Sequence, residues 1–161
     1  ADFVMDTSHS NIHEFANLLR DRVVGIATGE PNVLVISFSY RNGVPRDADM
    51  VFDVRFLRNP HYDPALRPLT GRDAGVGDYV AADPDFDEYF ARLTNLLALL
   101  LPRFREEAKS YLTIGIGCTG GRHRSVYVAE RLREWMAERM TRVELRHREL
   151  DFDTDTDEVR G

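Results

Sequence analysis

The sequence predicts an α/β domain with a mainly parallel sheet and flanking helices. Runs rich in β-branched and aromatic residues alternate along the chain with amphipathic segments whose apolar residues recur every three or four positions. This alternation is typical of βαβ units, in which helices connect parallel strands. The composition agrees with that class, because a chain of 161 residues that is 43% hydrophobic and 30% charged has the size and balance of one globular domain.

The first half of the chain predicts three strands and one helix. The end of a strand is expected at residues 1–8, and a helix follows it from Ile12 to Gly25. The segments 33–40 (VLVISFSY) and 50–57 (MVFDVRFL) are expected to be strands, because both are rich in β-branched and aromatic residues. Segment 58–71, which holds three prolines, is too irregular for a regular element, and loops of this length are often functional.

The second half predicts two helices that alternate with two strands. A helix is expected over 83–104, with Pro102 kinking or splitting it. A strand at 110–117 precedes a helix at 125–140, and a last strand is expected at 141–147. The buried stripe of the first helix should contain Phe86, Phe90, Leu93, Leu97, Leu100 and Phe104. The second helix should face inward through Val126, Ala129, Leu132 and Met136.

Charge and cysteine content limit the classes of ligand and compartment. One cysteine excludes an internal disulfide, and no apolar run reaches the roughly 18 residues of a membrane span, so we expect a cytoplasmic chain without a membrane partner. The net charge of −6 arises mainly in an acidic tail, whereas 122–148 holds eight arginines and four glutamates. These arginines indicate either a phosphate or nucleic-acid ligand, or ordinary pairing with the glutamates on a helix surface.

The segment GIGCTGGRHRSV, 115–126, is compatible with three kinds of phosphate chemistry. The first is a cradle that binds an anion without reacting, because a glycine-rich turn that opens a helix presents free N–H groups and the positive end of the helix dipole. The phosphate would be bound by the Thr119 hydroxyl, the Gly120 N–H and the Arg124 guanidinium. Gly121 would let the backbone adopt a positive φ or approach the ligand closely, and Arg122 and His123 would add charge.

The other two interpretations require residues elsewhere. The G-x-G-x-x-G of a dinucleotide site needs an acidic residue about 20 positions further on, whereas Glu149 and Asp151 lie about thirty residues past Gly120. A cysteine phosphatase would use Cys118 as nucleophile, Arg124 for the phosphoryl oxygens and Ser125 to support the thiolate. Its general acid would come from three unplaced candidates, Asp53, Asp63 and Asp73.

Two longer motifs resemble one bacterial family. DADMVFDVRFLRNPHYDPALRPLTGRD and SYLTIGIGCTGGRHRSVYVAERL are similar to the C-terminal domain of the RapZ/YvcJ family of nucleotide-binding proteins, from about Val33 to Arg148. The opening segment resembles the last strand and helix of that family's N-terminal P-loop domain, whose G-x-x-x-x-G-K-[ST] motif is absent here. We therefore expect three parts: 1–28 as the end of the P-loop domain with a linker, 29–150 as the ligand-binding domain, and 151–161 as a disordered acidic tail.

The resemblance also implies a fold, a ligand and partners. The fold would resemble part of a phosphofructokinase, and the domain would contribute to a homodimer or higher oligomer. It would sense an amino-sugar phosphate, glucosamine-6-phosphate, as part of a regulator of cell-envelope precursors, with ATP or GTP bound only by the missing P-loop domain. Neither a catalytic group nor a metal is expected in this chain. The pocket residues would be His61, Thr119, Gly120, Gly121, Arg122, His123 and Arg124.

Family members that act as RNA adaptors for an RNase are similar to one another in a basic C-terminal tail. The tail here is acidic instead, and like charges repel the phosphate backbone of RNA. RNA and protein binding are therefore kept as alternatives to phosphosugar sensing.

Overall fold

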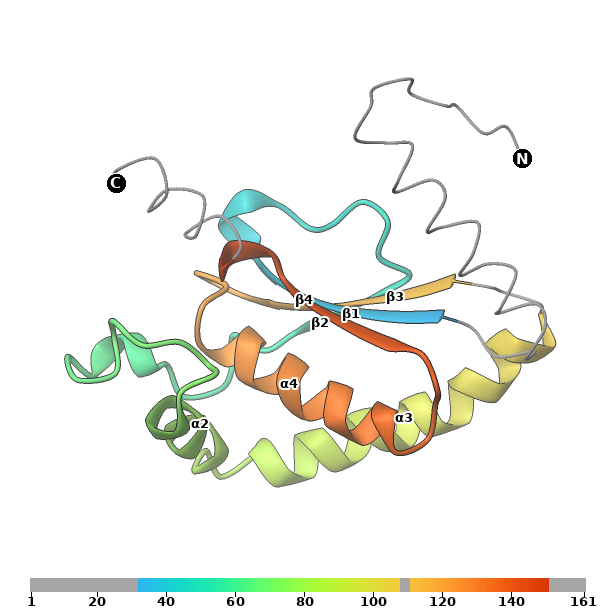
Figure 1. Cartoon of the computed structure of the whole chain (residues 1–161). Coiled ribbons are helices and arrows are strands. Elements are labelled where there is room, and N and C mark those ends of the chain that lie inside the picture. Colours follow the sequence, from blue (N-terminus) through green and yellow to red (C-terminus); the bar gives the residue numbers. More distant parts are fainter. Residues whose placement is uncertain (1–31, 108–110, 151–161) are drawn as a thin grey trace, which may run out of the picture.

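The computed structural model describes residues 32–107 and 111–150, and these residues form a parallel sheet covered by helices (Figure 1). The described strands stand in the order β2-β3-β1-β4, and each pairing between neighbours is parallel. Their bounds are β1 (Asn32–Ser39), β2 (Met50–Asp53), β3 (Tyr111–Cys118) and β4 (Val143–His147). The prediction of an α/β fold with a mainly parallel sheet is therefore confirmed.

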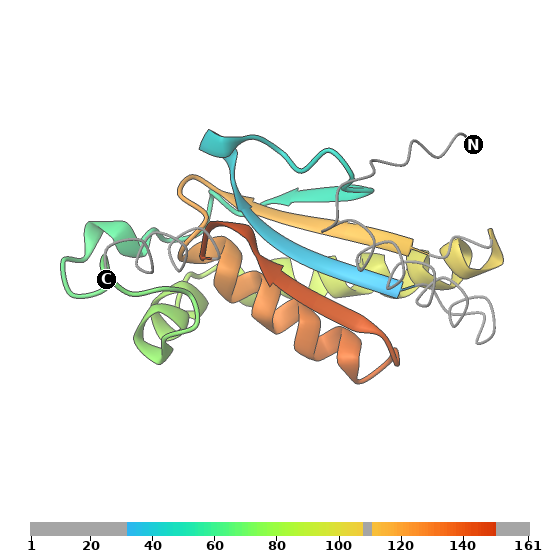
Figure 2. The same cartoon turned by 45° about the horizontal axis from the view of Figure 1, so that its top comes forward.

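The described segments contain three α-helices and two short 3-10 helices. They are the α-helices α2 (Ala74–Ala81), α3 (Phe86–Glu106) and α4 (Arg124–Ala137), and the 3-10 helices η1 (Tyr40–Asn42) and η2 (Pro60–Tyr62). Figures 1 and 2 show α2, α3 and α4 on the same side of the sheet. The main core lies between that side of the sheet and these helices.

The core is built from alternate strand residues and from one face of α4. Successive side chains of a strand point to opposite faces, so Val35, Ile114 and Ile116 all point toward the helices, and each of them is fully buried. The residues predicted for the inner face of α4 are all 0% exposed, and they are Val126, Ala129, Leu132 and Met136. Helical periodicity therefore predicted this face correctly.

Helix α3 differs from its prediction at one apolar position. Leu101, and not Leu100, is buried in the core, so the apolar stripe shifts by one residue near the end of the helix. Pro102 lies inside the helix and does not split it. Proline removes the hydrogen bond to the carbonyl four residues earlier, which belongs to the exposed Ala98 and is accessible to water.

Two further predictions about the elements were wrong. The strand expected over 50–57 ends at Asp53, because the Leu57 N–H donates to the Val54 carbonyl and both side chains turn into the core. Helix α2 was not predicted, and its short segment AGVGDYVA contains two glycines, which lower intrinsic helix propensity. The elements expected within 1–28 and the tail at 151–161 lie outside the described residues, so the division into three parts stays a prediction.

The carboxyl ends of three strands meet at one edge of the sheet. Ser39 of β1 pairs with Cys118 of β3, and Asp53 of β2 pairs with Gly117. The glycine-rich loop leaves the sheet at this edge and leads into α4. In parallel sheets ligands bind beyond the carboxyl ends of the strands, so the fold places this loop where a site is expected.

Candidate functional site

The loop between β3 and α4 contains two adjacent glycines with different constraints. Gly121 has a φ of 71°, and a Cβ there would lie 2.4 Å from Glu149 Cγ and 2.8 Å from the Ser39 nitrogen. The fold itself therefore requires glycine at this position. A Cβ at Gly120 would meet nothing within 4 Å, so the backbone of Gly120 faces open space.

Cys118 lies on the buried side of the loop. Its side chain is buried, its sulfur accepts the Gly121 N–H at 3.2 Å, and it lies 3.1 Å from Ser125 Oγ. Cys118 and Ser125 of the C-x5-R-S pattern are brought together here. However, Cys118 is only 2% exposed, so its sulfur does not line an open surface. A catalytic nucleophile must be accessible to its substrate.

Arg124, the first residue of α4, is 5% exposed and holds the chain that follows β2. Its Nη1 donates to the carbonyls of Arg55 and Leu57, the latter at 3.2 Å, and its Nη2 lies 3.5 Å from Thr119 Oγ1. The buried Nε–H has no hydrogen-bond partner within the described structure. The Nη1 donors are thus occupied, while the edge of the guanidinium formed by Nε and Nη2 retains donor capacity.

The two residues before Arg124 also contact the proline-rich segment. The Arg122 carbonyl accepts the Gly71 N–H at 2.8 Å, and His123 Nε2 lies 3.1 Å from the Arg67 carbonyl. A Cβ at Gly71 would be 2.4 Å from the His123 carbonyl oxygen, so this segment lies directly against the start of α4. Residues 122–124 therefore hold segment 54–71 in place through contacts to the backbone of that segment.

Burial lowers the pKa of His123 below its ordinary value, and the positive charges of Arg122 and His61 act in the same direction. Hydrogen bonds to the carbonyls of Arg67 and Leu69 oppose this shift. A neutral imidazole that donates to a carbonyl positions the proline-rich segment and adds no charge to an anion site. The geometry thus assigns His123 to the support of the loop.

His61 lies in η2 and has an exposed side chain. Its carbonyl accepts the Nε–H of Arg67 at 2.8 Å, and its ring packs at 6.4 Å against that of Tyr62. The carbonyl of Arg67 in turn contacts His123, so η2 belongs to the segment that packs against the start of α4. No contact joins the His61 side chain to the loop 118–124 among the described residues, and its role in the site stays a prediction.

A charged pair, Arg55 and Asp53, lies at the end of β2 on this edge of the sheet. Arg55 donates to Asp53 through a bidentate ion pair whose shortest distance is 2.6 Å, and its guanidinium lies 4.1 Å from the centroid of the Tyr40 ring. The hydrogen bond from Arg55 lowers the pKa of Asp53, and the charge of Arg124 adds to this effect. An acid that stays ionised in this way is poorly suited to protonate a leaving group.

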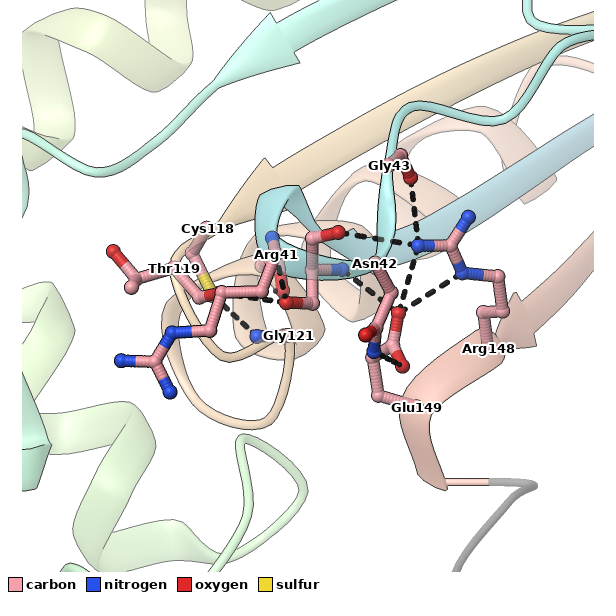
Figure 3. A network of polar contacts seen from close by, with 10 residues as sticks. Arg41, Asn42, Gly43, Cys118, Thr119, Gly121, Arg148 and Glu149 are labelled. Carbon is pink, nitrogen blue, oxygen red and sulfur yellow. Dashed lines mark hydrogen bonds and ion pairs between the residues drawn. The ribbon is translucent and has the colours of Figure 1, made fainter.

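The other side of the loop is held by a network of hydrogen bonds that the sequence did not predict (Figure 3). The Glu149 carboxylate accepts hydrogen bonds from the Ser39 N–H at 3.0 Å, from Asn42 Nδ2 at 2.8 Å and from Arg148 Nε at 2.9 Å. Arg148 also donates to the carbonyls of Ser39 and Gly43. Because Arg148 and Glu149 are more than one hundred residues from Ser39, Asn42 and Gly43 in sequence, no local pattern predicts the network.

Comparison with known proteins identifies the family of this domain. The sequence model of the RapZ C-terminal domain matches residues 31–151. The chain belongs to the RapZ C-terminal domain family. A nucleotide-binding protein of Paramagnetospirillum magneticum is 58% identical over 94% of this chain and 49% of its own length. The RNase adapter protein RapZ of Pectobacterium carotovorum is 45% identical over 94% of this chain and 53% of its own length.

A further relative in Rhodospirillum centenum, named as a nucleotide-binding protein, is 56% identical over 94% of this chain and 46% of its own length. The chain thus spans about half the length of these curated relatives. The resemblance to the RapZ/YvcJ family predicted from the two motifs is confirmed.

The glycines of this RapZ-family domain do not form a dinucleotide fingerprint. Gly115 and Gly117 lie inside β3, and a Cβ at Gly117 would be 2.5 Å from the Phe38 ring and 2.6 Å from the Tyr40 ring. They are glycines because aromatic rings pack directly on the strand. The Glu149 carboxylate is held by three donors, so it is not available to bind a ribose.

Two arginines of 122–148 have the local partners that the simpler interpretation predicted. Arg131 pairs with Glu134, and Arg139 pairs with Glu138. Glu130 accepts from Arg72 of the loop before α2. Separately, among the described residues no helix combines the length and apolar character needed to cross a membrane.

Proposed function

We propose that this domain is a non-catalytic sensor of an amino-sugar phosphate, glucosamine-6-phosphate, within a longer RapZ-type regulator. The phosphate binds in the loop 118–124, against the start of α4. The sugar extends from there toward the carboxyl ends of β1 and β2 and toward η2, where His61 orients it. Family membership and the position of the loop at the edge of a parallel sheet support this proposal.

The main observation behind the proposal is that the Arg124 guanidinium is fixed by backbone carbonyls and still has an unpaired donor. Two backbone carbonyls fix Nη1, so the side chain is oriented before any ligand binds. The Nε–H is buried without an acceptor, and an unsatisfied buried donor costs about 1–3 kcal/mol. An anion bound against the Nε and Nη2 edge would satisfy that donor with a charge-assisted hydrogen bond.

Two further features support an anion at this place. No side chain caps the start of α4, so its first N–H groups and the positive end of the dipole act on the adjacent loop. The Thr119 hydroxyl lies next to Arg124 Nη2, and the open backbone of Gly120 permits close approach of a phosphate. These groups supply donors of the kind that phosphate requires.

The substitution Gly120→Ala tests the site with little effect on the fold. A Cβ there meets no protein atom within 4 Å, so the unfolding free energy should change by less than about 1 kcal/mol. If the phosphate lies against this backbone, the methyl group should weaken binding of glucosamine-6-phosphate at least tenfold by calorimetry. Equal affinity of the variant and the parent would place the phosphate elsewhere.

The matched control is Gly43→Ala. Gly43 also has nothing within 4 Å of its Cβ position, although its φ of 90° makes alanine strained there. It lies after η1 and outside the loop 118–124, and only its carbonyl takes part in the network around Glu149. The control should lower stability somewhat and leave affinity for the sugar phosphate unchanged.

The cysteine-phosphatase alternative is separated from the sensor by the same titration. The buried sulfur of Cys118 and the ionised Asp53 both weigh against turnover. The parent protein should therefore release no phosphate from glucosamine-6-phosphate, and Cys118→Ser should bind it with the parent's affinity. Steady phosphate release that Cys118→Ser abolishes would establish the phosphatase instead.

The names of the relatives extend the proposal to the longer protein. One of them is an RNase adapter protein, and others are nucleotide-binding proteins. We infer that occupancy of this domain by the sugar phosphate controls contacts with a protein partner, and that copies of the domain associate in an oligomer. Sedimentation of the longer protein with and without the sugar phosphate tests both statements.

A further inference from the structure

Tyr89 of α3 packs against the segment that Arg124 holds. Its ring lies 4.8 Å from that of Phe56 in an edge-to-face contact. Phe56 stands between Arg55 and Leu57, the two residues whose carbonyls accept from Arg124. The Tyr89 side chain therefore packs on the segment whose backbone orients Arg124.

The Tyr89 hydroxyl is buried and has no hydrogen-bond partner within the described structure. Nearly all buried polar groups in native proteins are paired, so an unpaired hydroxyl calls for a partner such as a ligand, an ion or a water molecule. Desolvation raises the pKa of Tyr89 to about 12, and the nearby Asp53 and Tyr40 add to the shift. The hydroxyl is thus protonated over the physiological range and lies close to two other oxygen-bearing side chains.

Asp53 and Tyr40 lie beside the strand residue that precedes Cys118. Asp53 pairs with Gly117 across the sheet, and the Tyr40 ring lies over the same glycine. Tyr89 approaches the end of β2 from the helix layer, through its contact with Phe56. Polar side chains at the strand ends next to an anion site suit a ligand that has hydroxyl or amino groups adjacent to its phosphate.

We propose that Tyr89 is a specificity-determining residue whose hydroxyl hydrogen-bonds a hydroxyl or amino group on the sugar ring of the bound sugar phosphate. This inference rests on the proposed function of the loop 118–124. A buried hydroxyl that only the sugar satisfies disfavours ligands that lack the matching group, because it then stays unpaired. Phe56 is 52% exposed, so displacing its ring to admit the sugar disturbs little packing.

The test is Tyr89→Phe, measured by calorimetry against glucosamine-6-phosphate and against inorganic phosphate. The variant keeps the ring contact with Phe56 and deletes only the oxygen. Affinity for the sugar phosphate should fall about tenfold, and affinity for inorganic phosphate should not change. The melting temperature without ligand should be equal to or above that of the parent, because the deleted hydroxyl has no partner.

A matched control is Tyr79→Phe in α2, where the ring stacks under Arg58 and remains after the change. It should affect neither ligand. If the parent does not bind glucosamine-6-phosphate, the proposed function fails and this inference fails with it. If the parent binds it and Tyr89→Phe binds it equally well, only the inference about Tyr89 is overturned. Equal loss of both ligands with a lower melting temperature would give Tyr89 a structural role and would also overturn it.

Discussion

Arg124 combines a structural contact with a proposed ligand contact on a single guanidinium. Arg124→Lys keeps the charge but replaces a planar fork by a single ammonium, which cannot reach both carbonyls and a ligand at once. Because the carbonyls of Arg55 and Leu57 lose their donor, the unfolding free energy should fall by about 2 kcal/mol. Denaturant titration measures this change.

The control for Arg124→Lys is Arg131→Lys. Arg131 forms an exposed pair with Glu134, and such pairs contribute at most about 1 kcal/mol. If Arg124→Lys unfolds at the same denaturant concentration as the parent, the contacts to the two carbonyls do not stabilise the fold as we argue.

The lowered pKa of His123 predicts that the stability of the fold depends on pH. The folded protein holds its pKa below the ordinary 6.5, so the unfolded chain binds more protons as the pH falls. This contribution to stability is complete above about pH 6.5 and is lost as the pH falls through the folded pKa. His123→Gln keeps an N–H for the Arg67 carbonyl but does not titrate, so its unfolding free energy should depend less on pH.

Denaturant titrations of the parent and of His123→Gln between about pH 7.5 and pH 5 make this comparison. The lowered pKa of Asp53 acts in a different window, below its ordinary 3.8, and is common to both proteins. Identical pH profiles for the two would show that His123 is not buried in its neutral form.

Within strand β3, two glycines make room for aromatic rings. Gly117→Ala would place a methyl group 2.5 Å from the Phe38 ring, and overpacking of this kind costs about 1–3 kcal/mol. We expect Gly117→Ala to lower the melting temperature by several degrees in calorimetry. Thr113→Val, on the same face of β3, is a control with no added volume. An unchanged melting temperature for Gly117→Ala would mean that the rings do not pack as described.

Periodicity predicted the elements that have a strong apolar pattern. The inner face of α4 and the strands near 33–40 and 110–117 agree with the structure to within a residue or two. Segment 54–57 was assigned to a strand because its residues favour β structure, yet burial of Val54 and Leu57 turns the chain instead. Helix α2 has weak local signals and forms through packing against α3 and α4, which no local pattern shows.

For the site, the sequence predicted the place of the loop and could not predict the partners of its side chains. Arginine and histidine in a glycine-rich turn indicated exposed phosphate ligands. In the structure, the His123 ring and Arg124 Nη1 instead contact backbone carbonyls more than fifty residues away in sequence. Tyr89 was missed because its contact with Phe56 depends on how α3 packs against the segment after β2.

At the scale of the whole molecule, two polar junctions connect distant segments. Glu149 joins the end of β4 to the end of β1 and to η1. On the helix side, the buried His147 lies 2.7 Å from Ser37 Oγ through Nδ1 and 2.8 Å from Glu130 through Nε2, which connects β4, β1 and α4. Both junctions lie at the carboxyl ends of the strands, so the edge that forms the proposed site is fixed before a ligand binds.

A crystal structure of this domain with glucosamine-6-phosphate tests the central claim most directly. The account predicts phosphate oxygens at about 3 Å from Arg124 Nε or Nη2 and from the backbone of Gly120, with the sugar ring directed toward Tyr89. A complex in which the phosphate lies away from the loop 118–124, or a loop that stays empty at saturating ligand, would contradict it.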